Sequence, residues 1–357
     1  MAKRVSEPTY ERYVTRPLER FDEGNTAYSR ADAGEFPGLR QVLDHGLAKA
    51  EKGTAGYAPE DWALTMAGRA IDTLVRRTAF GRDSLPRRWP VPAGKFSAVR
   101  AEMSEKIKKV AKWFGADLTG ICEVNQVWIY SHWGPHTAKL SELANPGDPL
   151  EIPEEYQYAV VIATEMEYND VGRSPAVAPS TDLGYSKMAF VATSVAEFVR
   201  LLGYRAIPTG NDTALSIPLA VDAGLGELAR NGLLITEGYG PRVRLCKVLT
   251  DLPLEPDKPV DLGVQHFCDS CKRCADGCPA RAILDGERTA EPRNISTSAG
   301  VLKWPIDAER CLAWWVRNGT WCTNCIRVCP WNKPAGVLHK AVRGVVARTS
   351  LFDTTSS

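Results

Sequence analysis

Several features that would assign a chain of this length to a protein class are missing from its 357 residues. No run of apolar residues approaches the roughly 18 that a membrane-spanning helix requires. Lys and Arg number 44 and Asp and Glu number 43, so no excess of positive charge indicates a nucleic-acid partner. What remains is an ordinary globular composition, 44% hydrophobic and 24% charged, in a chain long enough for two domains.

The amino-terminal segment lacks the apolar stretch of a secretory signal, and no twin-arginine pair precedes a hydrophobic run. The sequence therefore predicts a cytoplasmic protein, although an exported protein from which a twin-arginine signal had been removed would look the same. Structural disulfides are rare in the cytoplasm, so the cysteines need another explanation.

Sequence signatures of common redox cofactors are also missing. No G-x-G-x-x-G follows a predicted strand, so a flavin or nicotinamide bound to a Rossmann fold is not indicated. C-x-x-C-H, the attachment motif of c-type haem, is absent. The D-x-H-x-x-G motif that usually accompanies a corrinoid with a histidine ligand is absent too.

Cysteine is concentrated in one segment, since eight of the 10 cysteines lie between Cys268 and Cys329. They form two arrays with the spacing of bacterial two-cluster ferredoxins, the second with a longer first interval. The arrays are Cys268-x2-Cys271-x2-Cys274-x3-Cys278-Pro279 and Cys311-x10-Cys322-x2-Cys325-x3-Cys329-Pro330.

In this pattern three closely spaced cysteines bind one 4Fe–4S cube, and the cysteine before proline ligates the other cluster. We therefore predict cluster A with ligands Cys268, Cys271, Cys274 and Cys329, and cluster B with ligands Cys278, Cys311, Cys322 and Cys325. Two structural zinc sites would also use eight cysteines, but the doubled C-x2-C-x3-C-P ending favours iron–sulfur clusters. Cys122 and Cys246 are expected to be buried small side chains.

Periodicity predicts helices and strands in alternation, which indicates an α/β or α+β core. Apolar residues at Met188, Val191, Val195, Phe198 and Leu202 predict a long helix that Asp182 or Thr181 caps and Gly203 ends. Further helices are expected near 58–77, near 96–113 and after a cap at Ser216. A turn is expected at 209–212. Strands are expected at 127–130, 158–163, 233–236 and 242–249. The predicted organisation is an amino-terminal region (1–95), a core (96–262), a cluster domain (263–335) and a tail (336–357), with linkers at 89–92 and 251–261.

The segment from Gly184 to Cys278 closely resembles the corrinoid- and iron–sulfur-dependent reductive dehalogenases. The matching pieces are Gly184-Tyr185-Ser186-Lys187-Met188 and residues 202–208, 210–220, 223–226, 230–236 and 240–244. Arg20-Phe21-Asp22, Asn25-Thr26 and Ser29-Arg30-Ala31 are similar to the opening motif of that family. The resemblance covers most of the chain and is weakest between residues 38 and 149.

This resemblance implies a nitroreductase-like corrinoid-binding domain followed by a bacterial ferredoxin-like domain with two 4Fe–4S clusters. It also implies a base-off cobalamin without a protein ligand on cobalt, in agreement with the missing histidine motif. The implied partners are a small organohalide substrate and an external low-potential electron donor, either of the ferredoxin or flavodoxin type or linked to a membrane. No nucleic-acid partner is expected, and a homodimer is left open.

The resemblance further implies a tyrosine proton donor at Tyr185, an asparagine at Asn211 and a basic residue at Arg244. Arg242 is the alternative to Arg244, because residues two apart on a strand share a face. A phenol is a weak acid, and a nearby cation eases its proton donation by stabilising the phenolate. Without the resemblance, Tyr185 would be interpreted as a core tyrosine and Asn211 as a turn residue.

Two further sets of residues are expected at the site. Thr181, one helical turn before Tyr185, and Trp304, close to Cys311, are candidates for the substrate pocket. The small-residue turns are expected to bind cobalamin through Thr209, Gly210, Asn211, Ser216, Gly224, Leu225, Asn231 and Leu233.

Two other functions remain open. Epoxyqueuosine reductases also combine cobalamin with two 4Fe–4S clusters, but that family uses an aspartate acid, binds RNA and tends to be basic. The Gly-Tyr-Ser-Lys-Met stretch and the Arg-Phe-Asp segment favour the dehalogenases. A non-catalytic electron-transfer protein would leave the first 260 or so residues unexplained.

Overall fold

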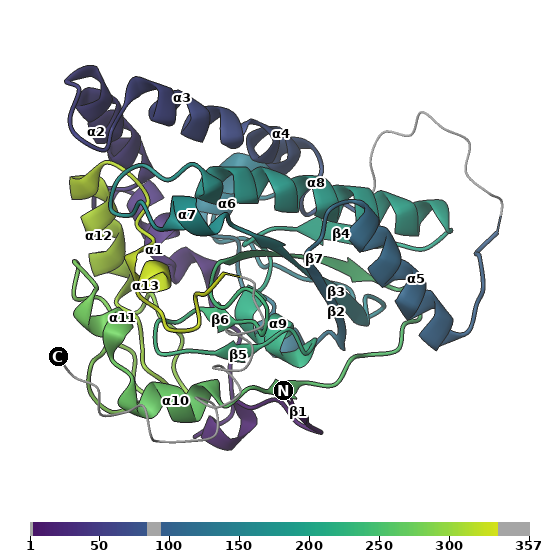
Figure 1. The fold of residues 1–357 in the computed structure, drawn as a ribbon. Helices are drawn as coiled ribbons and strands as arrows, with labels where there is room; N and C mark the ends of the chain where they lie inside the picture. The colour runs from purple at the N-terminus through teal and green to yellow at the C-terminus, as the bar shows by residue number, and fades with distance from the viewer. Residues whose placement is uncertain (1–2, 84–93, 335–357) are drawn as a thin grey trace.

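The computed structural model describes residues 3–83 and 94–334. At its centre lies a four-stranded sheet in the order β2-β3-β7-β4, in which every neighbouring pair is antiparallel. Its strands are β2 (Leu118–Glu123), β3 (Tyr158–Glu165), β7 (Val243–Thr250) and β4 (Ala206–Thr209). An antiparallel sheet with helices on its faces is the α+β form of the predicted fold class (Figure 1).

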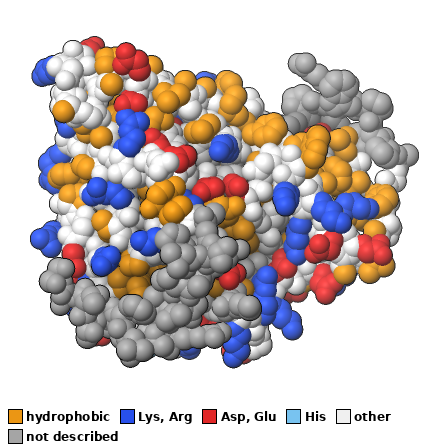
Figure 2. Space-filling view, viewed as in Figure 1, with side chains coloured by type: hydrophobic (Ala, Val, Ile, Leu, Met, Phe, Trp, Pro, Cys, Tyr) orange, Lys and Arg blue, Asp and Glu red, His pale blue; other side chains and the backbone are white. Residues whose placement is uncertain are grey.

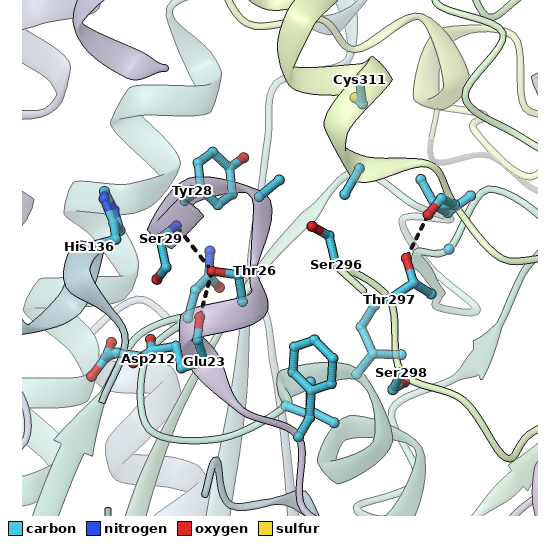
Figure 3. Close-up of a pocket in the computed structure, with 18 of the residues that line it drawn as sticks. Glu23, Thr26, Tyr28, Ser29, His136, Asp212, Ser296, Thr297, Ser298 and Cys311 are labelled. Atoms are coloured by element: carbon cyan, nitrogen blue, oxygen red, sulfur yellow. Dashed lines mark hydrogen bonds between the residues drawn. The ribbon is translucent and has the colours of Figure 1, made fainter. Parts of the chain in front are cut away.

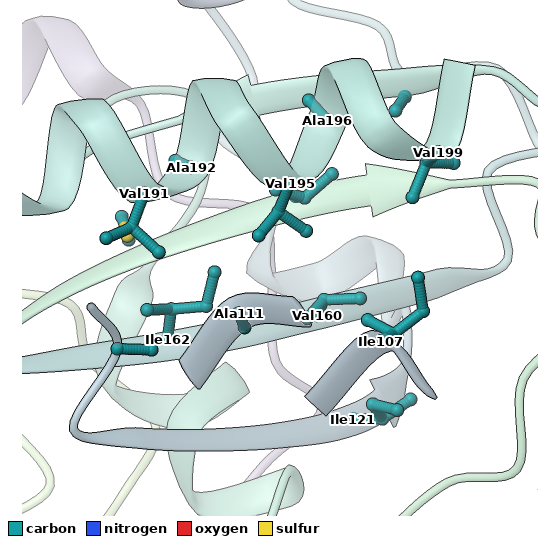
Figure 4. Packing of buried hydrophobic residues seen from close by; sticks show 14 of the residues in the cluster. Ile107, Ala111, Ile121, Val160, Ile162, Val191, Ala192, Val195, Ala196 and Val199 are labelled. Atoms are coloured by element: carbon teal, nitrogen blue, oxygen red, sulfur yellow. The ribbon is translucent and has the colours of Figure 1, made fainter. Parts of the chain in front are cut away.

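The first face of the sheet packs against α8 (Ser180–Leu201) and α5 (Arg100–Trp113). Val191, Val195 and Val199 of α8 point toward the apolar side chains of β3 and α5 (Figure 4). Burial of each valine side chain contributes roughly 1.5–3 kcal/mol. The predicted apolar stripe and the end of the helix at Gly203, where φ is +88°, are confirmed.

The opposite face packs against α9 (Ser216–Asp222) and buried aromatic side chains of the segment 128–156. Four helices from the amino-terminal region surround the site: α1 (Ala27–Asp32), α2 (Leu39–Glu51), α3 (Pro59–Gly68) and α4 (Ala70–Thr78). In Figure 1, α3 and α4 run beside α8.

The cysteine-rich region adds α10 (Val264–Ser270), α11 (Arg273–Asp276), α12 (Ala308–Asn318) and α13 (Asn324–Arg327), which lie to one side of the sheet (Figure 1). The remaining elements are short. They are β1 (Lys3–Arg4), β5 (Glu227–Leu228), β6 (Leu234–Ile235), β8 (Val260–Asp261), α6 (Pro135–Ser141), α7 (Tyr168–Val171) and the 3₁₀ turns Glu11–Tyr13, Glu23–Asn25 and Gln126–Trp128.

Several predictions about elements were wrong. Residues 127–130 form a 3₁₀ turn and a single bridge to Ala214 instead of a strand. The predicted helix at 58–77 is two helices that meet at Arg69. Thr181 and Asp182 lie inside the first turn of α8, which starts at Ser180, and therefore do not cap it.

The segment 251–261 is also not a free linker. Leu252 and Leu254 are fully buried in the core, and Asp257 accepts hydrogen bonds from the Ile121 amide and from Lys108. The other expected linker, 89–92, and the tail, 336–357, lie outside the described residues. The domain boundaries stay a prediction.

Among the described residues, no helix combines the length and apolar character needed to cross a membrane. Figure 2 shows acidic and basic side chains interspersed over the face in view. This mixture agrees with the formal net charge of +1.

Candidate active site

A cavity of about 500 Å³ lies between the core of the fold and the cysteine-rich region. Its core wall includes Tyr185 of α8, Arg244 of β7 and Asn211 of the loop after β4. Its opposite wall includes Cys311 of α12 and the segment 296–298. Figure 3 shows Ser296, Thr297, Ser298 and Cys311 across the cavity from Thr26, Tyr28 and Ser29 of the amino-terminal region.

Tyr185 meets both of its expected partners at the core wall. Its hydroxyl accepts a hydrogen bond of 3.2 Å from the Asn211 side-chain amide. The Arg244 guanidinium carbon lies 4.8 Å from the centre of the tyrosine ring. A Cβ atom at Gly184 would approach Arg244 Cγ to 2.9 Å, so this glycine leaves the space through which the arginine reaches the ring.

The alternative basic residue, Arg242, points elsewhere. Its side chain is buried and pairs with Glu165 Oε1 at 2.6 Å and with Asn332 Oδ1 at 3.3 Å. It does not line the cavity, whereas Arg244 does. Of the two arginines, Arg244 is therefore the one placed to act on Tyr185.

Sequence reasoning missed Arg69, which contacts Tyr185 from the other side. Its guanidinium carbon lies 4.5 Å from the tyrosine ring centre and 5.5 Å from that of Trp321. Arg69 forms a salt bridge with the Asp182 carboxylate, in which Nη1 of the arginine lies 3.0 Å from a carboxylate oxygen. Burial raises the pKa of Asp182, and Arg69 opposes that shift.

Arg76 was missed as well, and it is linked to Arg69 through one carboxylate. Asp72 accepts hydrogen bonds from Arg76 Nε at 2.9 and 3.0 Å and lies 3.6 Å from Arg69 Nε. The Arg76 guanidinium carbon is 5.9 Å from the Tyr185 ring centre. The spacing of these residues is the ion-pair pattern of a helix, but it does not reveal that the helix faces Tyr185.

The four cysteines predicted for cluster A lie together. Cys268, Cys271, Cys274 and Cys329 line a small second cavity, and each of the first three raises the pKa of Cys329 after the larger effect of burial. In the described part of the chain, no three His, Cys, Asp or Glu side chains come together as a site for a single metal ion. The four cysteines share the lining of that small cavity with Arg230, Asn231 and Trp331.

The second group adjoins the main cavity. Cys278 and Cys322 both act on Cys311 electrostatically, and Cys325 is influenced by these three thiols and also by Cys274 of the first group. Burial raises the pKa of Cys311 to about 12, so thiolates here would need a bound metal group to compensate their charge. Cys311 lines the cavity, whereas the cysteines of the first group do not.

Comparisons with known proteins agree with this arrangement. A family model described as a 4Fe-4S double cluster binding domain matches residues 267–332. A tetrachloroethene reductive dehalogenase of Desulfitobacterium hafniense is 41% identical over 278 residues, which cover 68% of this chain and 50% of the relative. The chain belongs to the reductive dehalogenase family. It spans about half the length of that relative.

Two solved structures of reductive dehalogenases share the fold. One is a catabolic reductive dehalogenase in complex with 3-bromo-4-hydroxybenzoic acid, with a TM-score of 0.71, 25% identity, and coverage of 98% of this chain and 47% of that chain. The other is described as suggesting a mechanism for B12-dependent dehalogenation, with a TM-score of 0.72, 25% identity, and coverage of 98% and 46%. The predicted fold class is confirmed.

The cavity of this family member suits a large ligand with an apolar body and polar edges, as a corrinoid is. Three buried polar atoms in its wall have no hydrogen-bond partner among the described residues: Ser29 Oγ, Arg244 Nε and Trp315 Nε1. Each of these atoms has less than 1 Å² of exposed surface, so they are enclosed by protein and do not open onto the cavity.

The corrinoid contacts expected from the small-residue turns are not gathered at the cavity. Of the eight, Asn211 lines it, and the seven others do not: Thr209, Gly210, Ser216, Gly224, Leu225, Asn231 and Leu233. Gly210 and Ser216 instead bond to Lys247, and Asn231 lines the small cavity beside cluster A. Other residues of the same turns, among them Asp212, Leu215 and Gly232, do line the cavity.

The two pocket candidates both reach the cavity. Thr181 and Trp304 are both buried and both line it. Trp304 donates its indole N–H to the Gly286 carbonyl at 3.2 Å, and the guanidinium groups of Arg230 and Arg288 each lie 4.3 Å from its ring centre. The indole is therefore held rigidly.

The amino-terminal wall adds residues whose roles the sequence did not reveal. Glu23 accepts a hydrogen bond of 3.0 Å from the Gly134 amide and another from the Thr137 hydroxyl. Burial raises the pKa of Glu23 to about 7. Burial also raises the pKa of Tyr28, so this phenol stays protonated and serves as a neutral wall residue.

Proposed function

We propose that the chain forms the catalytic cavity of a reductive dehalogenase, an oxidoreductase that removes halide from a small organohalide with cobalamin and two 4Fe–4S clusters. The observation that carries the proposal is the convergence of Tyr185, Asn211 and Arg244 on a cavity whose opposite wall contains Cys311. Replacement of a halogen by hydrogen consumes two electrons and one proton and releases a halide ion. The cavity has a proton-bearing phenol on one side and a cluster ligand on the other.

When bound, the reduced base-off corrinoid supplies the electrons that break the carbon–halogen bond. Trp315 and the segment 296–298 line the cavity and would contact it, and the hydroxyl groups of 296–298 are fixed by bonds within the protein. Aromatic rings around the cavity exclude water and favour an apolar substrate, with Thr181 and Trp304 as pocket walls.

Tyr185 is the proposed proton donor to the substrate carbon. Its hydroxyl proton leaves as the new carbon–hydrogen bond forms, and the resulting phenolate faces the guanidinium groups of Arg244 and Arg69. These cations stabilise the phenolate, while the Asn211 amide fixes the direction of the hydroxyl oxygen.

The cysteine arrangement supports a direction for electron delivery. Cys311 places the ligand set of cluster B against the cavity, whereas the cysteines of cluster A lie outside its wall. An external low-potential donor, of the ferredoxin or flavodoxin type or linked to a membrane, would therefore reduce cluster A first.

Halide release tests the proposal directly. The protein is reconstituted with cobalamin and iron–sulfide, reduced with a strong artificial donor and supplied with aryl and alkyl halides. We expect stoichiometric halide and dehalogenated product from at least one class. Absence of halide from every substrate, despite full loading of both cofactors, would contradict the proposal.

Tyr185→Phe separates proton transfer from cofactor loading. This variant keeps the ring and loses only the hydroxyl, so the visible spectrum of the loaded protein should be unchanged. Loss of a general acid typically costs on the order of 10²–10⁴ in rate, and we expect halide release to fall by that factor. A fully active variant would place the acid elsewhere.

A further inference from the structure

Lys247 lies in the apolar interior, at a position that the proposed reaction does not use. It belongs to β7 between Leu245 and Leu249, whose side chains share its face of the sheet because strand residues alternate. Its side chain is fully buried. A buried ammonium group is costly unless hydrogen bonds and opposite charges replace water, so its partners indicate what it does.

The loop between β4 and α9 supplies the acceptors around this ammonium group. Lys247 Nζ lies 2.6 Å from the carbonyl oxygen of Gly210, 2.9 Å from that of Asp212 and 3.0 Å from that of Ala214. Ser216 Oγ lies at 3.2 Å. The acceptors come from every second residue, so the loop folds around the lysine.

Asn211 stands between two of these acceptors. The carbonyl groups of Gly210 and Asp212 both accept hydrogen bonds from Lys247 Nζ. This one nitrogen therefore holds the backbone on both sides of Asn211. The Asn211 side chain then donates to the Tyr185 hydroxyl at 3.2 Å. A chain of direct contacts thus links the buried lysine to the proposed proton donor.

The loop adopts a backbone conformation that requires such support. Thr213 has φ of +71°, in the left-handed region that a β-branched residue rarely adopts. Asp212 braces the same turn, accepting from the Gly210 amide at 2.7 Å and from the Thr213 hydroxyl at 3.1 Å. Burial lowers the pKa of Lys247 to about 8 against the opposing effect of Asp212, so the amine is charged at neutral pH.

We propose that Lys247 is a positioning residue, which holds Asn211, and through it the Tyr185 hydroxyl, at the cavity wall. The contacts within the loop carry the structural part of this inference. Its consequence for turnover rests on the proposed function.

Hydrogen exchange tests the structural part without any turnover. Lys247→Met keeps an unbranched side chain, one atom shorter, and removes its N–H donors. We expect amide exchange in 210–216 to accelerate roughly tenfold or more, while exchange in β3 is unchanged. Lys108→Met is the matched control, because Lys108 lies on α5 outside the cavity and pairs with Asp257 at 2.7 Å.

Lys247→Gln keeps the inference testable if the methionine variant does not fold. An amide retains two N–H donors, so the exchange rate of 210–216 should fall between those of the unaltered protein and of Lys247→Met. Exchange that is unaltered in this segment in the folded variants would overturn the proposal.

Kinetics test the consequence for Tyr185. Lys247→Met should lower kcat on the order of tenfold to a hundredfold with little change in KM, because the misplaced group acts in the proton-transfer step. In an Asn211→Ala background the same change should cost little more, since the residue through which Lys247 acts is gone. An undiminished cost in that background would overturn the positioning role.

Failure of the two proposals can be told apart. If the unaltered protein releases no halide, the proposed function fails, and the exchange rates alone decide whether Lys247 fixes the segment that carries Asn211. If halide is released and kcat is unaffected by a demonstrably loosened loop, the positioning role is wrong while the proposed function stands.

Discussion

Tyr185 is surrounded by more positive charge than the family resemblance implied. Arg244 was expected beside it, and the structure adds Arg69 and Arg76, with Asp72 and Asp182 as the carboxylates that hold them. Three guanidinium groups and two carboxylates leave one cation in excess, which a phenolate would neutralise. Arg69 and Arg76 lie in the segment where the resemblance is weakest, so only the packing of α3 and α4 on α8 reveals them.

Arg69→Met should lower kcat by roughly tenfold or more, because one of the cations that stabilise the phenolate is lost. In the Tyr185→Phe background no phenolate forms, and the same substitution should then have little further effect on the residual rate. Rates of halide release, measured for Arg69→Met alone and in the Tyr185→Phe background, give the coupling between the two residues.

Arg40→Met is the control for this experiment. Arg40 is exposed on α2, pairs with Asp44 four residues away and does not contact the cavity. A loss of rate for Arg69→Met that persists undiminished without the Tyr185 hydroxyl would indicate a purely structural role for Arg69.

At the scale of elements, α8 must form a stable helix against the sheet and also leave space for the Arg244 side chain. Its stripe of small apolar residues packs on the sheet and was predicted from periodicity. Gly184, in its first turns, weakens the helix but admits the Arg244 side chain. The sequence predicted the helix, whereas the reason for its glycine becomes clear only when β7 is in place.

Gly184→Ala should separate stability from activity. Alanine favours a helix interior over glycine by about 1 kcal/mol, but the close contact with Arg244 Cγ opposes this gain, so thermal stability should change little. The added Cβ would meet Arg244 Cγ and displace the guanidinium group, so kcat should fall. Lys187→Ala, at an exposed position of the same helix, serves as the control and should leave kcat unchanged.

The predicted exchange of ligands between the two cysteine arrays is a second feature at this scale. Cys278→Ala should abolish cluster B and Cys329→Ala should abolish cluster A, although each residue belongs by sequence to the other array. Each variant should lose about half of its iron. Electron paramagnetic resonance of the reduced protein identifies the remaining cluster, and loss of the cluster within the same array would refute the exchange.

At the scale of the whole molecule, the cavity exists because three distant parts of the chain meet. The amino-terminal region supplies Tyr28 and Glu23, the core supplies Tyr185, and the cysteine-rich region supplies Cys311. Hydrogen bonds join these parts: Trp321 donates to Asp182 at 2.6 Å. The walls are therefore coupled, and stability and cavity shape depend on all three parts.

The buried carboxyl of Glu23 should make stability depend on pH. Burial raises its pKa from 4.5 to about 7, so the folded state binds a proton more tightly than the unfolded state. Between these pH values its contribution to the free energy of unfolding should fall as pH rises, by about 2–3 kcal/mol in all, and stay level above pH 7. Urea unfolding across this range checks the slope, which Glu23→Gln should reduce; an identical slope in both proteins would contradict this.

The sequence by itself determined the elements and groups whose signals are local. The cysteine spacing specified two clusters, because ligands of one cube must lie a few residues apart. Periodicity specified α8, because burial on one face repeats along a helix, and a nearly continuous apolar run specified the strand β3, which is buried on both faces. The family motifs indicated Tyr185, Asn211 and Arg244.

Only the tertiary structure decided how these groups meet. It chose Arg244 over Arg242, because the side chain of Arg242 is bound to Glu165 and Asn332. It brought Arg69 to the tyrosine and folded the segment 210–216 around Lys247. Local patterns specify which face of an element is buried, but the partner buried against it comes from a distant segment, and that pairing is a property of the folded chain.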